Sequence, residues 1–411
     1  MQSRYISVRK LGADAIPRGR YATHGVDSYP AKMVPHLARY AIQAVSRVGD
    51  TVYDPFCGCG TVIVESLILG RNAIGCDINP IAVLLARAKS ATVRIEHLAE
   101  LADDVVAVAQ RRDGGVHGYP RWLSYWFTPA VLQGLSDLAT AIRRVRQRGP
   151  YATVLLAALA LAVRRVSRAD PRSPKPFISK EARRVRLGRF FDPVVHYRAV
   201  IEELCQAYAD FSQRLPHEPP VVSVNLRDAR KMDRGLCVDQ VDGVVTSPPY
   251  LTAQDYYRSS KLEMAICGFW RHGIEAELGP NIIGSGRGTP THDGELVLPW
   301  EPRALKRVGD KSERAKQVIE AYMKDMSRVV GNVHDYLRPG GKCCLIIGDS
   351  TIQGIKLPVH SWVCSIAESQ GFCLEGHDVD LIAGRRVPPQ REGHRSIIDR
   401  EHLLFFRKSA C

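Results

Sequence analysis

The chain has 411 residues, more than one compact core usually needs, so a large domain with an insertion or a second domain is expected. Hydrophobic residues make up 45% and charged residues 24%, as in a globular protein, and the formal net charge is +14. This positive charge favours a polyanionic partner, such as a nucleic acid or an anionic membrane. The longest apolar stretch, residues 151–163, is too short to span a bilayer. The amino terminus lacks the apolar core of a signal peptide, so we expect a soluble cytoplasmic protein without a membrane partner.

Eleven cysteines are scattered through the chain, and several lie within apolar runs. An odd number of cysteines without regular spacing does not predict a disulfide framework and is typical of a reducing compartment. Cys57 and Cys59 form the only close pair with one residue between them, and no second pair stands at the spacing of a zinc site. The pattern therefore predicts no metal site.

The first part of the chain alternates helix and strand patterns. Apolar residues at helical spacing predict a helix over residues 30–48, and short strands are expected at 51–53 and 72–76. A helix over residues 61–69 separates the two strands, and Pro80 opens another helix at the first-turn position that proline tolerates. This β-α-β-α order predicts a parallel sheet and therefore an α/β fold.

A long helical segment interrupts this pattern. It shows amphipathic helical spacing and no convincing strand, with helices expected at 98–111, 129–148, 151–167 and 194–215. Residues 170–176 must form a loop, because three prolines within six residues forbid a helix. We therefore expect one sheet domain made of residues 1–94 and 218–411, with residues 95–217 as a helical insertion.

Strand patterns resume after the insertion, at 221–224, 243–245, 342–347 and 402–406. Together with the two earlier strands they complete a sheet that we expect to be mostly parallel. Residues 279–302 are rich in glycine and proline, so a surface loop or lid is expected there.

A glycine-containing turn follows the first expected strand. Gly58 and Gly60 allow the backbone to turn sharply and approach a ligand, and the helix from Thr61 points free N–H groups at it. Asp77, at the end of the next strand, can accept hydrogen bonds from ribose hydroxyls. These features suit a dinucleotide or S-adenosylmethionine. The dinucleotide fingerprint has a third glycine where this chain has Ile63, which favours S-adenosylmethionine.

Two motifs resemble those of the S-adenosylmethionine-dependent DNA amino-methyltransferases. Residues 54–61, Asp-Pro-Phe-Cys-Gly-Cys-Gly-Thr, are similar to the cofactor motif of that family. Residues 246–250, Thr-Ser-Pro-Pro-Tyr, are similar to its catalytic motif, in the form associated mainly with N4-cytosine enzymes. Residues 75–80 resemble the strand end that binds the ribose, 225–230 the strand end whose acid binds adenine, and 29–32 the segment that covers the methionine end. The resemblance implies a Rossmann-like methyltransferase sheet and these cofactor-binding residues: Tyr29, Lys32, Asp54, Phe56, Cys57, Gly58, Gly60, Thr61, Asp77, Ile78, Asp228, Ala229 and Thr246.

The four last residues of the catalytic motif suit methyl transfer to the exocyclic amine of a base. That amine is a poor nucleophile because its lone pair is delocalised into the ring. Ser247 Oγ and the Pro248 carbonyl could accept hydrogen bonds from its two N–H groups. Pro248 and Pro249 stiffen the loop and hold the acceptors in place. Tyr250 offers a flat face for a flipped base. Flipping costs a few kcal/mol, and stacking on an aromatic ring returns about 1–3 kcal/mol.

The resemblance of the catalytic motif to that of N4-cytosine enzymes makes cytosine N4 in duplex DNA the predicted target. Adenine N6 stays open because the two amines present similar geometry, and an RNA amino-methyltransferase would use the same chemistry. A different class of protein, a cofactor-binding nucleic-acid regulator without turnover, is opposed by the complete catalytic motif. The sequence does not disclose whether a restriction endonuclease accompanies the protein.

The positive charge is concentrated in the helical insertion. Residues 141–190 contain fourteen Lys or Arg and only two acids, Asp170 and Glu181. With so few local acids, we favour contact with DNA over a solvated helix face whose cations pair with acids elsewhere. The candidate DNA-binding residues are Arg143, Arg144, Arg165, Arg168, Arg172, Lys175, Lys180, Arg183 and Arg184. A smaller cluster could line the other side of the cleft that holds the DNA, opposite the insertion; it consists of Arg385, Arg386, Arg391 and Arg395.

Overall fold

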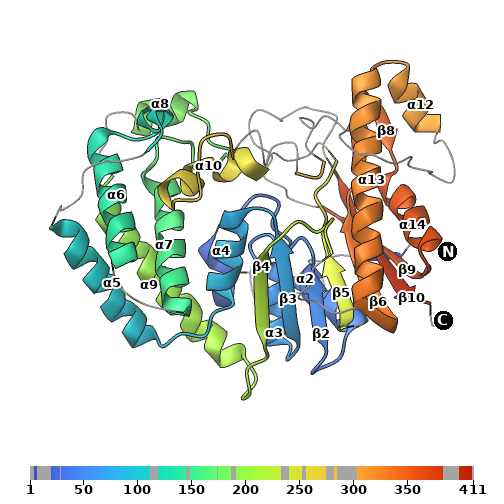
Figure 1. Ribbon diagram of the computed structural model, residues 1–411, viewed down its shortest axis with the longest axis horizontal. Coiled ribbons are helices and arrows are strands. Elements are labelled where there is room, and N and C mark those ends of the chain that lie inside the picture. The colour runs from blue at the N-terminus through green and yellow to red at the C-terminus, as the bar shows by residue number, and fades with distance from the viewer. Residues whose placement is uncertain are drawn as a thin grey trace.

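The computed structural model describes residues 4–6, 20–27, 29–111, 119–144, 149–173, 175–186, 191–232, 240–251, 256–274, 282–284, 303–382 and 398–409. Within them, an eight-stranded sheet runs through the molecule with helices on both of its faces (Figure 1). The strand order is β1-β9-β10-β6-β5-β2-β3-β4. The strands are β1 (Arg4–Ile6), β2 (Thr51–Asp54), β3 (Asn72–Asp77), β4 (Val222–Leu226), β5 (Val241–Thr246), β6 (Leu337–Ile347), β9 (Phe372–Leu381) and β10 (Arg400–Lys408).

The sheet is mostly parallel, as the sequence predicts. Strand β10 is antiparallel to its neighbours β9 and β6, and the other neighbouring strands of this sheet pair in parallel. Because parallel strands need crossover connections, helices must cover both faces. The fold is therefore α/β and Rossmann-like, with the ligand expected at the carboxyl ends of the parallel strands.

The second half of strand β6, residues 343–347, is apolar without interruption because it is covered on both faces. Cys343 and Leu345 pack into the core beneath α13 (Glu313–Tyr336) and α14 (Val359–Ser369). Cys344 and Ile346 point to the opposite face and pack with α2 (Pro35–Val45). Successive side chains of a strand alternate between faces, so a strand covered on both sides carries apolar residues at every position.

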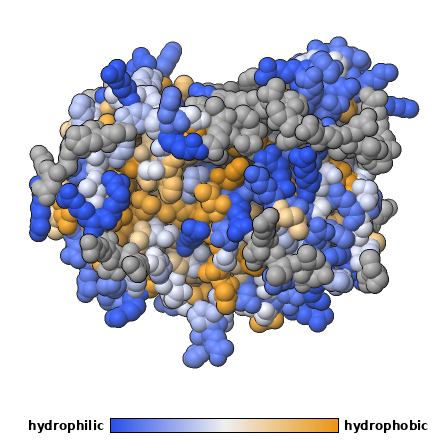
Figure 2. All heavy atoms as spheres, in the orientation of Figure 1, coloured by the Kyte–Doolittle hydropathy of each residue, from blue (hydrophilic) through white to orange (hydrophobic). Residues whose placement is uncertain are grey.

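The helical middle of the chain packs beside the sheet rather than apart from it. Helix α7 (Pro150–Val166) contacts α9 (Pro193–Arg214), α6 (Pro129–Arg144) and, on the sheet side, α4 (Pro80–Lys89). One hydrophobic core runs without a break from α3 (Thr61–Ile68) and α4 into these helices. Figure 2, in the orientation of Figure 1, shows apolar residues gathering on this face over α7, α4 and β4. The remaining elements are η2 (Ala22–Val26), α5 (Ile95–Gln110), η3 (Arg121–Tyr125), α8 (Lys180–Arg186), α10 (Tyr256–Ile266), α12 (Arg303–Gly309), β7 (Ser350–Ile352) and β8 (Ile355–Leu357).

Most of the expected elements are confirmed with small shifts at their ends. The helix expected over residues 30–48 begins only at Pro35, where the fixed proline φ suits the first turn. Helix α8 was not expected, because the proline loop before it and the basic residues within it carry no apolar periodicity. The loop expected over residues 279–302 lies outside the described residues apart from 282–284.

Two general expectations can be compared with the described residues. The nine cysteines in this part of the chain are free, in agreement with the absence of a predicted disulfide framework. Among the described helices, none combines the length and the apolar character that crossing a membrane requires.

Candidate active site

A cavity opens at the carboxyl ends of β2, β3, β4 and β5, where the sequence places its ligand-binding turns. Its volume is about 1020 Å³, counted together with the space open to solvent. The predicted residues that line it are Tyr29, Lys32, Asp54, Phe56, Cys57, Gly58, Thr61, Asp77, Ile78, Asp228, Ala229, Ser247 and Pro249. Gly60, Thr246, Pro248 and Tyr250 lie next to these residues in the chain but do not line the cavity.

The glycine turn between β2 and α3 needs its two glycines for different reasons. Gly58 and Gly60 have positive φ angles of 49° and 85°, a backbone conformation that residues with a side chain rarely adopt. A Cβ on Gly60 would lie 2.9 Å from the Cα of Ala86, so this glycine allows the turn to pack closely on α4. Gly58 instead presents its backbone N–H, which donates to Asp77 Oδ2 at 3.0 Å. The turn is thereby joined to the end of β3.

The Asp77 carboxylate is fixed by the backbone while it lines the cavity. Its Oδ1 accepts from the N–H of Asn79 at 2.8 Å, and its Oδ2 from that of Gly58. Burial raises the pKa of Asp77 to about 6, although these backbone hydrogen bonds act in the opposite direction. An ionised carboxylate held in this way can accept hydrogen bonds from a diol such as ribose.

Asp54 joins the glycine turn after β2 to the loop of residues 246–250, which carries the predicted catalytic motif (the catalytic loop). Its Oδ1 accepts from Thr246 Oγ1 at 2.6 Å and from the N–H of Phe56 at 3.1 Å. Burial raises the pKa of Asp54 to about 7, and the hydrogen bond from Thr246 opposes this rise. The contact fixes the end of β5 against the end of β2. It therefore sets the position of the residues that follow Thr246.

Asp228, the acid after β4, is engaged within the protein. Arg230 donates to both of its carboxylate oxygens, with Nη2 2.7 Å from Oδ2, and also reaches Asp325 at 3.2 Å. Burial opposes ionisation of Asp228, but the hydrogen bonds from Arg230 outweigh it and hold the pKa below the ordinary value. Asp228 lines the cavity and stays charged, with Arg230 determining its orientation.

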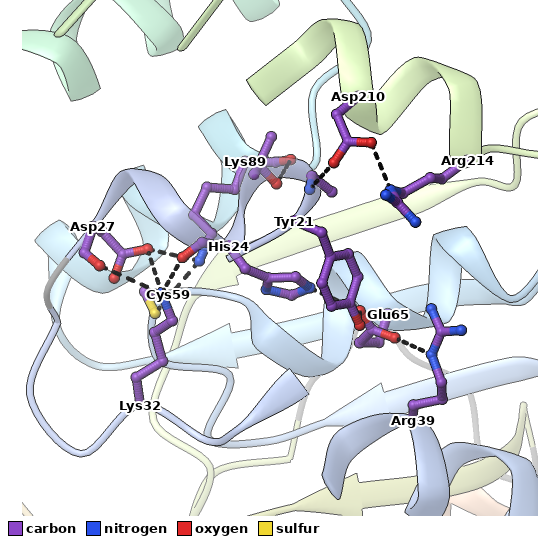
Figure 3. A network of polar contacts seen from close by, with 12 residues as sticks. Tyr21, His24, Asp27, Lys32, Arg39, Cys59, Glu65, Lys89, Asp210 and Arg214 are labelled. Atoms are coloured by element: carbon purple, nitrogen blue, oxygen red, sulfur yellow. Dashed lines mark hydrogen bonds and ion pairs between the residues drawn. The ribbon is translucent and has the colours of Figure 1, made fainter. Parts of the chain in front are cut away.

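Lys32 belongs to a buried polar network behind the cavity (Figure 3). Asp27 lies between two lysines, with its Oδ2 2.8 Å from Lys89 Nζ and 3.3 Å from Lys32 Nζ. Lys32 also donates to the carbonyl of His24, and Lys89 to Cys59 Sγ at 3.6 Å. Burial and the neighbouring ammonium of Lys89 lower the pKa of Lys32. The pair of cations around one carboxylate leaves local positive charge beside the cavity, which suits the carboxylate of a methionine group.

The same segment is anchored to α3 through Glu65 (Figure 3). Three groups reach this fully buried carboxylate: Tyr21 Oη at 2.5 Å, His24 Nε2 at 2.8 Å and Arg39 Nε at 2.9 Å. Burial lowers the pKa of His24 to about 4 despite the adjacent carboxylate, so His24 is a neutral donor at neutral pH. These contacts hold η2, and with it the segment that begins at Tyr29, against the sheet.

The catalytic loop after β5 presents its residues in different directions. Ser247 and Pro249 line the cavity, whereas Pro248 is buried and lines a separate, smaller apolar cavity together with residues such as Phe56. Tyr250 Oη contacts Glu401 Oε1 at 2.9 Å and receives a longer hydrogen bond, 3.4 Å, from Ser247 Oγ. The buried proline ring therefore anchors the loop and leaves Ser247 on the cavity side.

The structure identifies cavity residues that the sequence analysis missed. Asn79 caps α4 with its Oδ1 and donates from Nδ2 to Tyr29 Oη and to Ser260 Oγ, at 3.0 and 3.1 Å. It thereby connects the cofactor motif, the segment before it and α10. Asn79 stands two residues after Asp77, and Arg227 stands next to Asp228, inside segments that the sequence analysis singles out. The other missed lining residues, among them Met33, Tyr257, Met264, Ile282 and Ile283, belong to no motif. Neither does Ser260, which contacts Asn79.

Several of the candidate DNA-binding residues are engaged within the protein. Arg165 forms a two-pronged ion pair with Glu203, both contacts at 2.6 Å, and Arg172 pairs with both Asp170 and Glu181 at 2.7 Å. Arg168 donates to the backbone carbonyls of Ser124 and Tyr125, and Arg164, in the same helix region, to that of Ser173.

The candidates with exposed side chains include Arg143, Lys180 and Arg183, and Lys175 is half-buried. Arg144 is exposed and makes contacts within the protein. The backbone of Arg184 lies in α8, but its side chain is outside the described part of the structure, as is the whole cluster from Arg385 to Arg395.

The chain resembles DNA methyltransferases along its sequence. Residues 12–87, which hold the cofactor turn, match the N6/N4 methyltransferase family model described as DNA methylase. The type II methyltransferase M.MvaI of Kocuria varians is 22% identical over 367 residues, which cover 82% of this chain and 79% of that protein. The type II methyltransferase M.MjaII of Methanocaldococcus jannaschii is 36% identical over 83 residues, 20% of this chain and 16% of that protein. Among solved structures, the rRNA methyltransferase aviRa of Streptomyces viridochromogenes aligns with 99% of this chain and 97% of its own, at 11% identity and a TM-score of 0.35.

The sequence matches make this chain similar to S-adenosylmethionine-dependent DNA methyltransferases of the N6/N4 amino-methylase family. They do not distinguish cytosine N4 from adenine N6. The residues of the cavity fit that cofactor, because a fixed carboxylate at Asp77, apolar side chains at Phe56 and Ile78 and the ammonium of Lys32 line one continuous space.

Proposed function

We propose that this protein transfers a methyl group to the N4 amine of a cytosine flipped out of duplex DNA. The supporting observation is that Ser247 and Pro249 of the catalytic loop line the same cavity as Asp77. Cofactor and acceptor groups thus meet in one space at the carboxyl edge of the sheet. The chain spans most of a relative that is named a type II methyltransferase, which agrees with a DNA substrate and a short recognition site.

The residues of this cavity suggest a division of labour. Asp77 would hold the ribose, Phe56 and Ile78 would contact the adenine, and Lys32 would neutralise the methionine carboxylate. Asp228, held by Arg230, is the candidate acceptor for the adenine amine. Bound S-adenosylmethionine supplies an electrophilic methyl group whose sulfonium charge activates it.

The catalytic loop would prepare the attacking nitrogen. Ser247 Oγ and the Pro248 carbonyl would accept hydrogen bonds from the two N–H groups of the amine, which favours a pyramidal nitrogen with its lone pair free. The buried ring of Pro248 keeps these acceptors in position, so little reorganisation is needed during the reaction. Tyr250 would support the flipped base by stacking.

Cytosine is preferred to adenine because position 247 is serine, the form that resembles N4-cytosine enzymes. Adenine N6 is the alternative within the same chemistry. A cognate restriction endonuclease is a proposed partner, since the relatives named above are type II methyltransferases.

Residues 95–217 are proposed as the target-recognition region. Helix α8, which carries Lys180 and Arg183, lies at the top of Figure 1, on the same side of the molecule as α10. Helix α10 itself reaches the cavity through Ser260 and Tyr257. Cations on this side would contact phosphates around a flipped base.

The experiment is methylation of mixed-sequence duplex DNA by the full chain with labelled S-adenosylmethionine, followed by nucleoside mass spectrometry. N4-methylcytosine supports the proposal, and N6-methyladenine would correct the base while keeping the fold and mechanism. Label in RNA alone, or in no nucleic acid, would overturn it. The matched control is Ser247→Ala, which removes one acceptor and should retain cofactor binding.

A further inference from the structure

Four residues that are well separated in the sequence meet beside the catalytic loop. Asp349 follows β6, His360 lies in the first turn of α14, His377 lies in β9 and His402 in β10. Because β10 is inserted between β6 and β9, the sheet brings them together. A nitrogen from each of the three histidines lies within 4.8 Å of a nitrogen from the other two.

The contacts between these groups are direct. Asp349 Oδ1 lies 2.7 Å from His360 Nδ1, and His377 Nε2 lies 2.9 Å from His402 Nδ1. The second oxygen of Asp349 faces His402 Nε2 at 3.7 Å, which is too long for a hydrogen bond. His402 is 6% exposed, and its Nε2 has no hydrogen bond with any residue that the structure describes.

This arrangement favours a cation between His402 and Asp349. When His402 donates from Nδ1 to His377, its Nε2 carries a lone pair that points at a carboxylate. Two electron-rich groups in a buried space repel each other unless a cation lies between them.

We propose that His360, His402 and Asp349 bind a divalent transition-metal ion, with Zn²⁺ as the representative ligand, and that His377 orients His402. Imidazole nitrogens with one carboxylate form a donor set that Zn²⁺ prefers. His377, by accepting the Nδ1 proton of His402, selects the tautomer whose Nε2 can bind the metal. The rings of His360 and His402 are stacked, 3.8 Å between centroids, so one of them must turn for both to bind one ion. His360 has the room to do so, because its side chain is 19% exposed and it begins a helix.

The site lies next to the residue that would support the flipped base. Gly348 precedes Asp349, and a Cβ added to it would lie 3.0 Å from Tyr250 Cε2, so the Tyr250 ring packs directly on this glycine. Glu401 precedes His402 and contacts the Tyr250 hydroxyl. A metal ion that joins the end of β6 to β10 would therefore hold the residues that contact Tyr250 in a rigid arrangement. Its role would be structural, without a part in the methyl transfer.

The test is titration of the chelator-treated full chain with Zn²⁺ alone, followed by calorimetry. We expect one equivalent to bind with an affinity at least 100-fold higher than that of His402→Gln, and 10- to 100-fold higher than that of His377→Gln. Bound Zn²⁺ should also raise the unfolding temperature of the wild type. His97→Gln is the control, since His97 is exposed on α5 and distant in sequence from the cluster.

His360→Gln keeps the test decisive if His402→Gln fails to fold, because His360 is partly exposed and its loss leaves the contact of His402 with His377. This variant should fold and lose at least 10-fold in Zn²⁺ affinity. Absorption of bound Co²⁺ gives a second readout, because nitrogen and oxygen ligands lack the intense thiolate bands that the buried cysteines would produce. The proposal is overturned when the wild type binds no equivalent of Zn²⁺, or when binding is unchanged in both His360→Gln and His402→Gln.

Discussion

The hydroxyl of Tyr250 lies 2.9 Å from Oε1 of Glu401, so a contact across 151 residues of chain connects the catalytic loop to the start of β10. The ring of the same tyrosine packs on Gly348 at the end of β6. Tyr250 is thus held at its hydroxyl and at its ring edge, without lining the cavity itself. A flat support for a base must be held rigidly to be effective, and Glu401 is the group that fixes its polar end.

We expect Glu401→Ala to lower kcat about tenfold, because a hydrogen bond to a charged group contributes roughly 1.5 kcal/mol to orientation. Glu401→Gln retains an acceptor and should recover most of the lost rate. The dissociation constant of S-adenosylmethionine, measured by calorimetry, should be the same in both variants. An equal loss in the two variants, or weaker cofactor binding, would contradict a positioning role for Glu401.

Tyr250→Ala should retain cofactor binding and lose methylation. Removal of the ring takes away stacking of about 1–3 kcal/mol on the flipped base, which partly offsets the cost of flipping. The check is single-turnover methylation of duplex DNA alongside cofactor titration. Tyr250→Phe separates the ring from its hydroxyl, since it keeps the ring and loses the hydroxyl contacts with Glu401 and Ser247, and it should fall between the wild type and the alanine variant. Unimpaired turnover of Tyr250→Ala would disprove the stacking role.

Binding of S-adenosylmethionine should weaken as the pH falls through about 6. Burial raises the pKa of Asp77 to about 6, and only the ionised form can accept from both ribose hydroxyls without giving up an acceptor oxygen to a proton. We expect the dissociation constant to rise about tenfold between pH 7 and pH 5, where Asp77 takes up a proton.

The matched pair of variants for this pH effect is Asp77→Asn and Asp54→Asn. Asp77→Asn should bind the cofactor weakly at pH 7 and lose the step near pH 6. Asp54→Asn should keep that step, because its own pKa lies near 7 and its carboxylate accepts from Thr246 instead. A step that survives in Asp77→Asn would assign the titration to another group.

Much of the sheet could be predicted because its central strands are buried on both faces. Strands β2, β3, β5 and β6 are short apolar runs followed by turn residues, and each was found near its expected place. Strand β9 was not predicted, since it carries His377, Asp378 and Asp380 within a half-buried pattern that lacks the apolar signal. The hydrogen bonds of β10 and β1 on either side of it make it a strand.

The site could be predicted only where its residues share a motif. Asp77 and Ser247 follow strands, and the edge of a parallel sheet brings such residues together. Glu401, Asp349 and the histidines near them depend on the insertion of β10 into the sheet, which no local pattern reveals. The buried ion pairs of Asp27 depend likewise on how η2 packs on α3 and α4, so no single position in the sequence predicts them.

Acid should destabilise the protein through His24. The folded protein lowers the pKa of His24 to about 4 by burial, whereas the unfolded chain has the ordinary value near 6.5, so the unfolded state binds the extra proton between these values. Stability is therefore complete above about pH 6.5 and falls as the pH decreases toward 4. The expected loss between pH 7 and pH 5 is about 2 kcal/mol, measured as the free energy of unfolding in urea.

His24→Asn tests this origin of the acid sensitivity. The variant should be less stable at pH 7, since Glu65 loses one of its donors, but its stability should fall about 2 kcal/mol less between pH 7 and pH 5. His36→Asn, in the neighbouring helix α2, is the control and should follow the wild type. Parallel pH profiles of His24→Asn and the wild type would show that other groups cause the acid sensitivity.

The exposed cations of α8 should determine how DNA binding depends on salt. Each phosphate contact that is lost reduces the slope of log K against log salt by about 0.9, so Lys180→Gln with Arg183→Gln should flatten the slope by about 2. Fluorescence anisotropy with a duplex oligonucleotide at several salt concentrations measures this slope. The control, Arg47→Gln with Arg338→Gln, removes the same charge at the amino ends of β2 and β6, opposite the cavity. It also breaks the ion pair of Arg338 with Asp242, but it should leave the slope unchanged. Arg165 and Arg172 are poor choices for this test because they already pair with Glu203, Asp170 and Glu181. Equal slopes in the α8 variant and the wild type would place the DNA on another surface.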